Sequence, residues 1–388
     1  MNPILTDLPT TIFDVMSGLA RELNAVNLGQ GFPDDPGPED VRLKAADAVF
    51  NGYNQYPPMM GLPELRQAIA AHYKRFQGTD LDPATEVMVT SGATEALAGA
   101  LLAILNPGDE VVLFQPMYDA YLPLVRRAGG VPKFVNLDPP SWTMTREALE
   151  QAFSPRTRAV LFNNPHNPCG VVYERAQLEL LAEFCVRYDA IAICDEVWEH
   201  LLFDGRQHVS MINLPGMRER TVKIGSAGKI FSLTGWKVGL VAAAAPVMKG
   251  LAKAHQFITF TTPPNLQVAV AHGLMKDDSY FSGMRAGFQR SRDRLSKGLA
   301  DIGFKVIPSQ GTYFVAIDIG GLEINDDVEF SQKLVRDFGV ATIPISAFYA
   351  ENVHRHAVRF CFAKNDQTQD KALERLRKAA AAFGVSGA

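Results

Sequence analysis

The sequence predicts an α/β protein with two units, a larger one built on a mainly parallel sheet and a smaller α+β one. Short apolar runs without polar alternation recur between residues 86 and 243, and longer helical patterns lie between many of them. Such runs are typical of strands that are covered on both faces, and strands that alternate with helices form a parallel sheet. Beyond residue 278, one long helical pattern is followed by a mixture of short strands and helices. We therefore expect the larger unit to precede the smaller one along the chain.

Each predicted element follows from its own pattern of apolar residues. In the larger unit, the predicted strands span residues 86–90, 111–114, 159–163, 191–195, 221–226 and 238–243, and the predicted helices span 94–105, 119–128, 146–153 and 175–187. In the smaller unit, the predicted helices span 278–302, 328–338 and 367–383, and the predicted strands span 304–307, 311–319, 340–343 and 358–363.

The first forty residues are rich in proline and glycine, and no long helix is expected there. This segment is expected to pack on the smaller unit or to reach a partner subunit. The expected division is an N-terminal arm with part of the small domain at 1–40, a large domain at 41–284 and a small C-terminal domain at 285–388.

Composition places the chain among ordinary globular proteins. Its 388 residues suffice for two to three domains of about 150 residues each. Hydrophobic residues make up 47% and charged residues 21%, which excludes a disordered, collagen-like or small disulfide-rich chain. A net charge of −4 gives no basic field, so neither nucleic acid nor an anionic membrane is an expected partner.

The cysteines and the apolar stretches indicate the compartment. Cys169, Cys185, Cys194 and Cys361 are widely spaced, which predicts reduced thiols and neither a disulfide framework nor a metal site. The first thirteen residues carry no basic residue, unlike a signal peptide. The longest apolar stretch, 239–248, is far shorter than the roughly 20 residues that span a bilayer. We expect a soluble cytoplasmic protein.

Small residues follow the first predicted strand of the sheet. Ser91, Gly92, Ala93 and Thr94 stand between this strand and the next helix. Backbone N–H groups at the start of a helix attract anions, and small side chains let a phosphate approach them. The segment is therefore a candidate phosphate site, with an ordinary tight turn as the alternative.

A carboxylate ends another predicted strand. Asp195 follows the apolar run 190–194, and Glu196 comes directly after it. Ligands of open α/β sheets bind beyond the carboxyl ends of strands, and an acid there must be solvated, paired or bonded to a cationic ligand. Asp195 is thus a candidate ligand-binding acid. A helix N-cap or a surface acid is the alternative, and it is favoured for Glu196.

The segment 163–170, Asn-Asn-Pro-His-Asn-Pro-Cys-Gly, predicts a rigid turn after a strand. The amide of Asn167 could donate to an oxygen anion from this turn. His166 is expected to be a packed loop histidine rather than a catalyst.

Lysines and small residues follow the strand at 221–226. Lys229 ends the string Ser-Ala-Gly-Lys, and Lys237 ends Thr-Gly-Trp-Lys. A desolvated lysine beside a second cation has a lowered pKa and attacks carbonyls. Lys229 is the candidate nucleophile and Lys237 the second cation or a phosphate partner, whereas a lone lysine would be a solvated surface charge.

These pieces together match one cofactor. A phosphate site, an acid for a pyridinium nitrogen and a reactive lysine are what pyridoxal phosphate requires of a protein. The acid keeps the ring nitrogen protonated, so that the ring accepts electrons. The lysine holds the cofactor as an imine and later moves a proton.

At these residues the sequence resembles the class I, fold-type I pyridoxal-phosphate aminotransferases, from Asn27 to Lys364. The motifs are Pro-His-Asn-Pro, Asp-Glu-Val and Ser-Ala-Gly-Lys followed by Thr-Gly-Trp-Lys. Within the class it is most similar to the kynurenine aminotransferase, glutamine transaminase K and bacterial methionine aminotransferase group. It is also similar to the actinobacterial N-succinyldiaminopimelate aminotransferases, which share Gln-Gly-Phe-Pro-Asp and Asn-Gln-Tyr-Pro-Pro. The resemblance implies a transaminase whose large domain binds the cofactor.

The resemblance implies a role for each matching residue. Lys229 would bind the cofactor and move the proton, Asp195 would pair with the ring nitrogen, and Asn167 would donate to the phenolic oxygen. Tyr118 would stack on the ring. The phosphate contacts would be Gly92, Ala93, Thr94, Ser226, Lys237 and, from the other subunit, Tyr56. A homodimer with active sites at the interface is therefore implied.

Substrate binding is implied for three residues. Arg359, within Val-Arg-Phe-Cys-Phe, would grip the substrate α-carboxylate as a planar two-pronged donor. The Gly31 backbone and Asn167 would complete this carboxylate site.

Trp198 departs from the family pattern, in which Asp-Glu-Val-Tyr is usual. The tyrosine hydroxyl bonds the phenolic oxygen of the cofactor, whereas an indole N–H donates and cannot accept. Trp198 is still expected to contact the cofactor, and we expect it to change the pKa of the cofactor imine.

The substrate class is open to alternatives. Phe32, Tyr118 and Phe260 could line an apolar pocket, and no motif residue takes the role of the second arginine used for dicarboxylates. The expected donor is an L-amino acid with an apolar, sulfur-containing, aromatic or glutamine-like side chain, used with a 2-oxo acid in a ping-pong reaction. Such a pocket separates near-isosteres by only about 1–3 kcal/mol, so a broad range is expected.

Two other enzymes and one regulator are the alternatives. The enzymes are an N-succinyldiaminopimelate aminotransferase of lysine biosynthesis and a pyridoxal-phosphate-dependent C–S β-lyase. A ligand-sensing regulator is disfavoured, since the motifs begin by Asn27 and leave no room for an N-terminal DNA-binding module.

Overall fold

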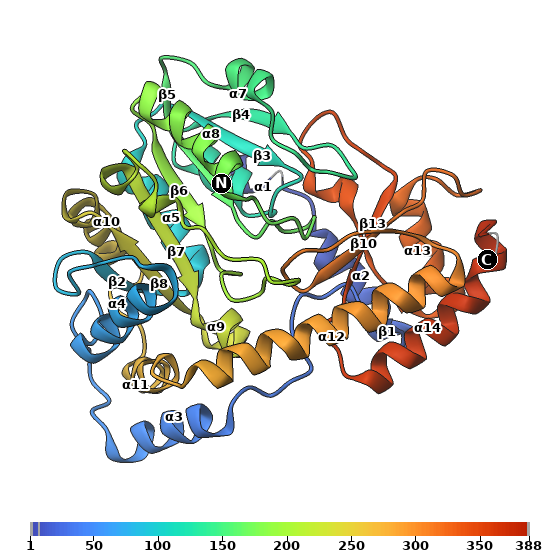
Figure 1. Ribbon diagram of the computed structural model, residues 1–388, viewed down its shortest axis with the longest axis horizontal. Coiled ribbons are helices and arrows are strands. Elements are labelled where there is room, and N and C mark those ends of the chain that lie inside the picture. Colours follow the sequence, from blue (N-terminus) through green and yellow to red (C-terminus); the bar gives the residue numbers. More distant parts are fainter. Residues whose placement is uncertain (1–2, 7, 386–388) are drawn as a thin grey trace.

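A seven-stranded mixed sheet forms the centre of the larger part of the molecule (Figure 1). The computed structural model describes residues 3–6 and 8–385. The sheet order is β2-β8-β7-β6-β5-β3-β4; β8 runs antiparallel to both neighbours, and the other pairs are parallel. The strands are β2 (Val87–Ser91), β3 (Glu110–Gln115), β4 (Val131–Asn136), β5 (Thr157–Asn163), β6 (Ile191–Asp195), β7 (Thr221–Ser226) and β8 (Val238–Ala243). The mainly parallel sheet predicted from the sequence is confirmed.

Helices cover both faces of this sheet, as the continuous apolar runs predict. Alternate strand residues such as Leu161 and Ile193 pack toward one layer of helices, and their neighbours Val160 and Ala192 pack toward the other. The first layer holds α5 (Gly92–Ile104), α6 (Tyr121–Arg127) and α10 (Ala245–Ile258). The second holds α7 (Arg146–Ala152) and α8 (Arg175–Arg187), then α4 (Pro63–Gln77), α11 (Pro264–Leu274) and α3 (Glu39–Asn51).

A four-stranded antiparallel sheet forms the smaller part. Its order is β12-β13-β10-β9, and three helices pack on its buried apolar side chains. The strands are β9 (Lys305–Ile307), β10 (Phe314–Asp318), β12 (Ile343–Pro344) and β13 (Ala357–Cys361); the helices are α12 (Asp278–Ile302), α13 (Asp327–Phe338) and α14 (Asp366–Ala380). Helix α12 runs from the larger part into the smaller one (Figure 1), so the expected boundary between residues 284 and 285 falls within one helix.

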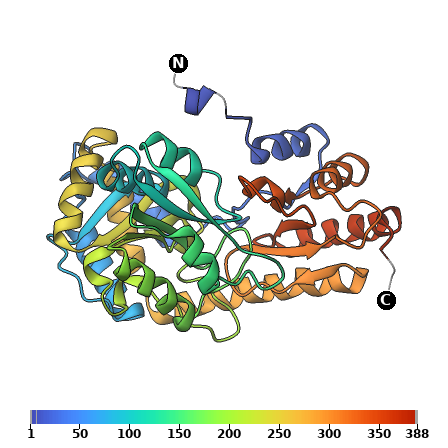
Figure 2. The ribbon, with the colours of Figure 1, turned by 90° about the horizontal axis from the view of Figure 1, so that it is seen from above.

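The N-terminal segment contains a helix that the sequence analysis did not expect. Helix α2 (Ile12–Glu22) begins after Thr11, whose hydroxyl accepts a hydrogen bond from the N–H of Asp14, and it packs on α13 and β12. The expectation of no long helix in this arm is therefore wrong, because a Thr cap and an apolar face outweigh the surrounding prolines and glycines. Figure 2 shows α2 beside the smaller part, whereas α1 (Pro3–Thr6) approaches helix α6 of the larger part.

Several further elements differ from the prediction. Helices α3, α4, α10 and α11 and the short strand β1 (Val26–Asn27) were not predicted. Strand β4 was not predicted; it carries Pro132 and Lys133 at the edge of the sheet, where both residue types are tolerated. The single strand predicted at 340–343 is two strands, because β11 (Val340–Ala341) pairs with β1 (Val26–Asn27) while β12 joins the four-stranded sheet. The remaining short turns are α9 (Ala227–Ile230), η1 (Met211–Asn213), η2 (Arg218–Arg220), η3 (Thr234–Trp236), η4 (Ile345–Phe348) and η5 (Ala381–Phe383).

All four cysteines are buried and unpaired, in line with the predicted reduced thiols. Among the residues that the structure describes, no helix combines the length and the apolar character that crossing a bilayer requires.

Candidate active site

The carboxyl ends of β5, β6 and β7 frame a cavity of about 170 Å³ at one edge of the large sheet. Open α/β sheets bind ligands at this edge. The cavity is lined by Gly92, Ala93, Thr94, Tyr118, Asn167, Asp195, Trp198, Ser226, Lys229 and Lys237, which were predicted for the cofactor, and by Leu97, Tyr121, Asn163, Val197 and Thr234. The fold thus brings together predicted residues from separate parts of the sequence.

One end of the cavity is suited to an anion. Gly92 starts α5 with φ 76°, and a Cβ at this position would lie 3.0 Å from Cε and 3.3 Å from Nζ of Lys237. Lys237 itself is in the left-handed region at φ 54°. The helix N-terminus and the ammonium group therefore meet at a backbone that carries no side chain, which is the environment a phosphate favours.

Asp195 lies at the other end, at the last position of β6. Its carboxylate accepts hydrogen bonds from the Tyr121 hydroxyl at 2.6 Å and from the Val197 N–H at 3.3 Å. Burial raises the pKa of Asp195 to about 6, while both hydrogen bonds and nearby Lys229 act in the opposite direction. At neutral pH this buried carboxylate is ionised and suited to pair with a cationic group of a ligand.

Tyr121 was not singled out in the sequence analysis. It lies one turn after Tyr118, at the start of α6, and the two rings meet edge to face with centroids 5.6 Å apart. The Tyr-x-x-Tyr spacing is the signal that could have indicated both residues.

Lys229 lies in the short helix α9 and points its amine into the cavity. Its Nζ is 3.4 Å from the Gly31 carbonyl oxygen and 4.5 Å from the centroid of the Trp198 ring. Burial lowers the pKa of Lys229 to about 8, and the cations Arg359 and Lys237 act in the same direction. A substantial fraction of this amine is unprotonated near neutral pH, as a nucleophile requires.

Arg359 lies on β13 of the small sheet and reaches the same site. Its Nη1 donates to Asn167 Oδ1 at 2.8 Å, its Nη2 donates to the Gly29 carbonyl at 2.9 Å, and its Cζ lies 3.8 Å above the Phe314 ring. The side chain is 1% exposed, its Nε has no hydrogen-bond partner, and burial lowers its pKa to about 9. No carboxylate of the described chain forms an ion pair with this cation, so the site is suited to a carboxylate from a ligand.

Gly31 adjoins this arginine. A Cβ at Gly31 would lie only 2.7 Å from Cζ of Phe314, so a larger residue would push away the ring on which Arg359 stacks. The neighbouring motif is tied to the sheet, because Asn163 accepts from the N–H of Asn167 and donates to the Asp195 carbonyl, both at 2.7 Å. His166 is buried and burial lowers its pKa to about 3, which agrees with a packed loop histidine.

Gly31 and Arg359 adjoin the cavity without lining it, and the three expected aromatic residues Phe32, Tyr56 and Phe260 also lie outside it in the single chain. Tyr56 is 79% exposed and meets Phe260 edge to face on the surface. Phe32 is half exposed, and the amine of Lys364 lies 4.5 Å from its ring centroid. Of the three aromatic residues expected to line an apolar pocket, only Tyr118 does so, because the other two rings are held against Lys364 and Tyr56.

Other aromatic residues approach the arginine instead. The ring centroids of Phe13 and Phe348 lie 5.3 and 5.1 Å from Arg359 Cζ, and Phe13 belongs to the unexpected helix α2. Asp119 is partly buried and interacts electrostatically with Arg359, and burial raises its pKa. This part of the site was missed because its position depends on how α2 packs.

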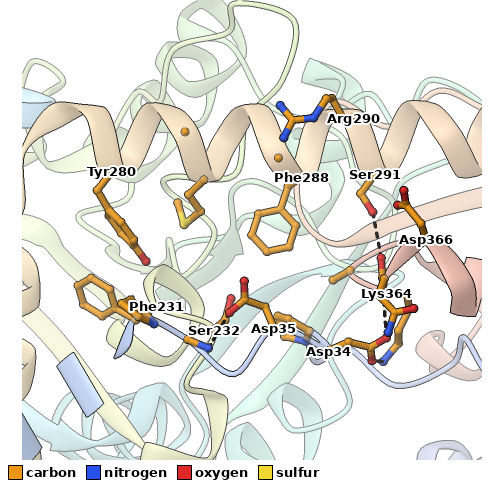
Figure 3. Close-up of a pocket in the computed structure, with 18 of the residues that line it drawn as sticks. Asp34, Asp35, Phe231, Ser232, Tyr280, Phe288, Arg290, Ser291, Lys364 and Asp366 are labelled. Carbon is orange, nitrogen blue, oxygen red and sulfur yellow. Dashed lines mark hydrogen bonds and ion pairs between the residues drawn. The ribbon is translucent and has the colours of Figure 1, made fainter. Parts of the chain in front are cut away.

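A second, larger hollow of about 1030 Å³ lies between helix α12, residues 231–232 and the segment 33–38 (Figure 3). In it, Tyr280 and Phe288 of α12 face Phe231 and the segment 33–38. Its Lys364 is already paired with Asp34 at 3.1 Å, and none of the predicted site residues lines it. The smaller cavity is therefore the candidate active site.

Comparison with known proteins identifies the family of this chain. Residues 24–376 match the family model described as "Aminotransferase class I and II". The chain is 44% identical to the Probable N-succinyldiaminopimelate aminotransferase DapC of Mycobacterium tuberculosis, over 95% of each chain. It is 39% identical to the methionine aminotransferase of Escherichia coli, over 96% of this chain and 97% of that one.

A solved structure of the N-succinyldiaminopimelate aminotransferase from Mycobacterium tuberculosis superposes with a TM-score of 0.94, covering 97% of this chain and 98% of that one at 44% identity. Fold and sequence thus agree with these relatives over nearly the whole chain. The protein belongs to the class I and II aminotransferase family and is a pyridoxal-phosphate-dependent transaminase.

Proposed function

We propose that this transaminase takes its amino group from an L-amino acid with an uncharged side chain, either apolar, sulfur-containing, aromatic or glutamine-like. The observation that carries the proposal is Arg359, a buried cation that forms no ion pair with a described carboxylate and is set among Phe13, Phe314 and Phe348. The arginine supplies a place for the α-carboxylate, and the aromatic rings around it favour an apolar neighbour. The acceptor is a 2-oxo acid, and the two substrates use the same site in turn.

The residues present fit pyridoxal phosphate, since a Cβ at Gly92 would crowd the lysine beside the helix N-terminus. When bound, the cofactor supplies a ring that accepts electrons from the substrate Cα. In this proposal Gly92, Ala93, Thr94, Ser226 and Lys237 hold the phosphate. Asp195, oriented by Tyr121, holds a proton at the ring nitrogen, and Tyr118, Asn167 and Trp198 contact the ring or its oxygen.

Lys229 has two tasks in this proposal. It would hold the cofactor, and its free amine would take the proton from the substrate Cα. The lowered pKa of about 8 supports this role, because the amine must lose its proton near neutral pH before it can act as a base. Arg359, the Gly31 backbone and Asn167 orient the substrate for this transfer.

Asp119 supports an uncharged donor. This partly buried carboxyl interacts electrostatically with Arg359, so a second carboxylate on the substrate would meet a like charge nearby. The relative named methionine aminotransferase agrees with such a donor. The relative at 44% identity, named for N-succinyldiaminopimelate, favours an acidic donor and is the second candidate.

Steady-state kinetics with 2-oxoglutarate as acceptor separate the two candidates. We expect kcat/KM for L-methionine and L-glutamine to exceed that for N-succinyl-L,L-diaminopimelate. The variant Asp119→Asn should raise the relative rate with the acidic donor and leave methionine nearly unchanged. A clear preference of the wild type for the acidic donor would replace the proposal with the second candidate.

We also propose that the active enzyme is a homodimer in which Tyr56 reaches the phosphate of the other subunit. The exposed surface near Tyr56 supports this, since Phe50, Tyr53 and Phe257 are each more than 70% exposed there or on nearby segments. Large apolar patches of this kind mark interfaces, and two-fold dimers are the commonest closed assembly.

Mixed subunits test the dimer directly. Lys229→Ala and Tyr56→Ala homodimers should each be impaired, but refolding them together creates one site with both residues intact. We expect the mixture to regain part of the activity. If the mixture stays as inactive as its parents, or if a strictly monomeric species has full activity, the shared site is wrong.

A further inference from the structure

A buried cluster of charged residues lies directly behind the candidate active site. At its centre Lys223, on β7, is fully buried, and its Nζ donates to Glu196 Oε2 at 2.7 Å and to Glu199 Oε2 at 2.6 Å. The ammonium also lies 4.4 Å from the ring centroid of Tyr73. Gly225 leaves room for this cluster, because a Cβ there would lie 2.4 Å from the Tyr73 hydroxyl and 3.0 Å from Glu199 Oε1.

The two carboxylates have further donors. Glu196 accepts from Ser210 Oγ at 2.9 Å and from the Met211 N–H at 3.3 Å, and His208 Nε2 lies 2.8 Å from its Oε2. Gln77 donates to Glu199. Burial by itself would raise the pKa of Glu196, but Lys223 and His208 outweigh it and lower the pKa to about 2; the two glutamates raise the pKa of Lys223. The cluster is thus a stable set of paired charges.

A metal ion is the first alternative for this cluster. Glu196, Glu199 and His208 each offer one ligand atom, and these atoms lie within 4.8 Å of one another. The ammonium of Lys223 is already within hydrogen-bond distance of both carboxylates. The place of a bound cation is therefore taken by a side chain of the protein itself.

The cluster joins the two segments that form the cofactor site. Glu196 and Glu199 flank Val197 and Trp198, and these two residues line the active-site cavity together with Asp195. Lys223 stands on the strand that leads to Ser226 and then Lys229. Along the 195–199 segment, Asp195, Val197 and Trp198 thus face the cavity, while Glu196 and Glu199 meet Lys223 behind it.

We propose that Lys223 is a positioning residue for the cofactor site: held between Glu196 and Glu199, it fixes the segment carrying Asp195 and Trp198 against the strand that leads to Ser226 and Lys229. This inference rests on the proposed roles of Asp195 and Lys229. Without the ammonium, the two glutamates repel each other and the segment shifts, so that Asp195 no longer matches the ring nitrogen.

The test separates positioning from mere stability. Lys223→Met leaves two unpaired buried carboxylates, so it should destabilise the protein without cofactor, as removal of one partner of a buried pair does. The triple variant Lys223→Met, Glu196→Gln, Glu199→Gln removes all three charges and should recover most of that stability. The readouts are the denaturant unfolding curve of the cofactor-free protein, the Kd for pyridoxal phosphate and the pH midpoint of the bound cofactor's absorbance.

We expect the triple variant to fold and yet bind pyridoxal phosphate about 10- to 100-fold more weakly, as is typical when residues that orient the direct ligands of a bound group are changed. Its pH midpoint should shift as well. The proposal would be overturned if the triple variant, folded with wild-type stability, bound pyridoxal phosphate with the wild-type Kd and showed the wild-type pH midpoint of the cofactor's absorbance. If the wild type itself fails to bind pyridoxal phosphate, the proposed function fails instead, so the two failures are distinguishable.

Two single variants keep the test decisive if the triple variant does not fold. Glu199→Gln preserves shape and removes one charge, and it should weaken cofactor binding in the same direction by a smaller factor. Tyr73→Phe removes a buried hydroxyl that has no hydrogen-bond partner and keeps the ring beside Lys223, so it should leave the Kd unchanged. Equal cofactor affinities in wild type, Glu199→Gln and Tyr73→Phe would contradict the proposal.

Discussion

Lys223 and Lys229 lie on one stretch of chain, and both are buried, but their surroundings are opposite. Lys223 has two carboxylates within 2.7 Å, and they raise its pKa. Lys229 has a carbonyl oxygen at 3.4 Å and an aromatic ring, and burial lowers its pKa to about 8. A charge that is fully paired stabilises the fold, whereas a charge that is left without a partner remains available for a ligand.

The neighbours Asp195 and Glu196 repeat the same contrast. Burial raises the pKa of Asp195 to about 6, while Lys223 and His208 overcome burial and lower the pKa of Glu196 to about 2. Arg359 belongs with Lys229 and Asp195, because all three are buried and none forms an ion pair with another described residue. The comparison separates residues available to bind a ligand, such as Asp195 and Lys229, from paired residues that hold the ligand-binding residues in position, such as Glu196 and Lys223.

The largest expected effect comes from removing the unpaired lysine. Lys229→Ala should abolish turnover, because no other amine lines the cavity at the position of the Lys229 Nζ among the described residues. It should not destabilise the protein without cofactor, since no ion pair is lost. Activity assays and denaturant unfolding check the two statements, and normal turnover in this variant would remove the central role of Lys229.

The second effect concerns Arg359. Arg359→Lys keeps the charge but loses the planar pair of donors, and we expect the transition-state free energy to rise by about 2–5 kcal/mol, as for other truncated buried charge contacts. The loss should fall on kcat/KM, with the absorbance of bound pyridoxal phosphate unchanged. A variant with wild-type kcat/KM would show that another group binds the α-carboxylate.

Opposite stability changes at adjacent carboxyls would sharpen the comparison. Asp195→Asn should stabilise the cofactor-free protein by about 1–3 kcal/mol at pH 7, because it removes a buried charge whose pKa is raised. Glu196→Gln should destabilise it by about 3 kcal/mol, because Lys223 and His208 lose their shared partner. Denaturant unfolding of both variants and of the wild type measures the two changes in the free energy of unfolding. Changes of the same sign would contradict the claim that the two carboxyls affect stability in opposite ways.

The pH dependence of the two variants follows from the same pKa values. The folded pKa of Asp195 is about 6 and its ordinary value is 3.8, so the wild type loses stability as pH rises through this range, and the advantage of Asp195→Asn disappears below it. The folded pKa of Glu196 is about 2 and its ordinary value is 4.5, so its contribution is present above 4.5 and is lost as pH falls toward 2.

The smallest effect is expected at Trp198. Its ring lies near the Lys229 amine and is held edge to face by Tyr313 and Phe314, with centroids 4.7 and 5.8 Å away. Trp198→Tyr introduces a hydroxyl that can both donate and accept, so the pH midpoint of the bound cofactor's absorbance should shift with little change in stability. Superimposable titrations of the two proteins would end this idea.

Local patterns predicted six of the seven strands of the large sheet and the three helices α12, α13 and α14, whereas the helices α3, α4, α10 and α11 were not predicted. The helices at 175–187 and 278–302 match α8 and α12 end to end, and the large-sheet strands differ by a few residues at most, because long periodic and continuous apolar runs depend little on distant contacts. Helix α2 was hidden by a composition typical of loops, and β4 by the proline and lysine that an edge strand tolerates.

The site was predictable where a residue follows the end of a strand. Asp195, Asn167 and Lys229 all follow strands of one sheet, so their meeting was implied by the topology. The position of Phe13 depends on how helix α2 packs against the smaller part, and the sequence carries no local sign of that. The role of Tyr56 depends on a second subunit, which one chain does not contain.

The most direct test of the account is the absorbance of the protein with pyridoxal phosphate, before and after L-methionine is added without an acceptor. We predict that the wild type binds the cofactor, that Lys229→Ala loses the imine band, and that methionine converts the wild-type cofactor to its amino form while methionine's 2-oxo acid is released. A wild-type spectrum that methionine leaves unchanged, while N-succinyl-L,L-diaminopimelate converts it, would contradict the proposed donor. A wild type that binds no cofactor would contradict the site itself.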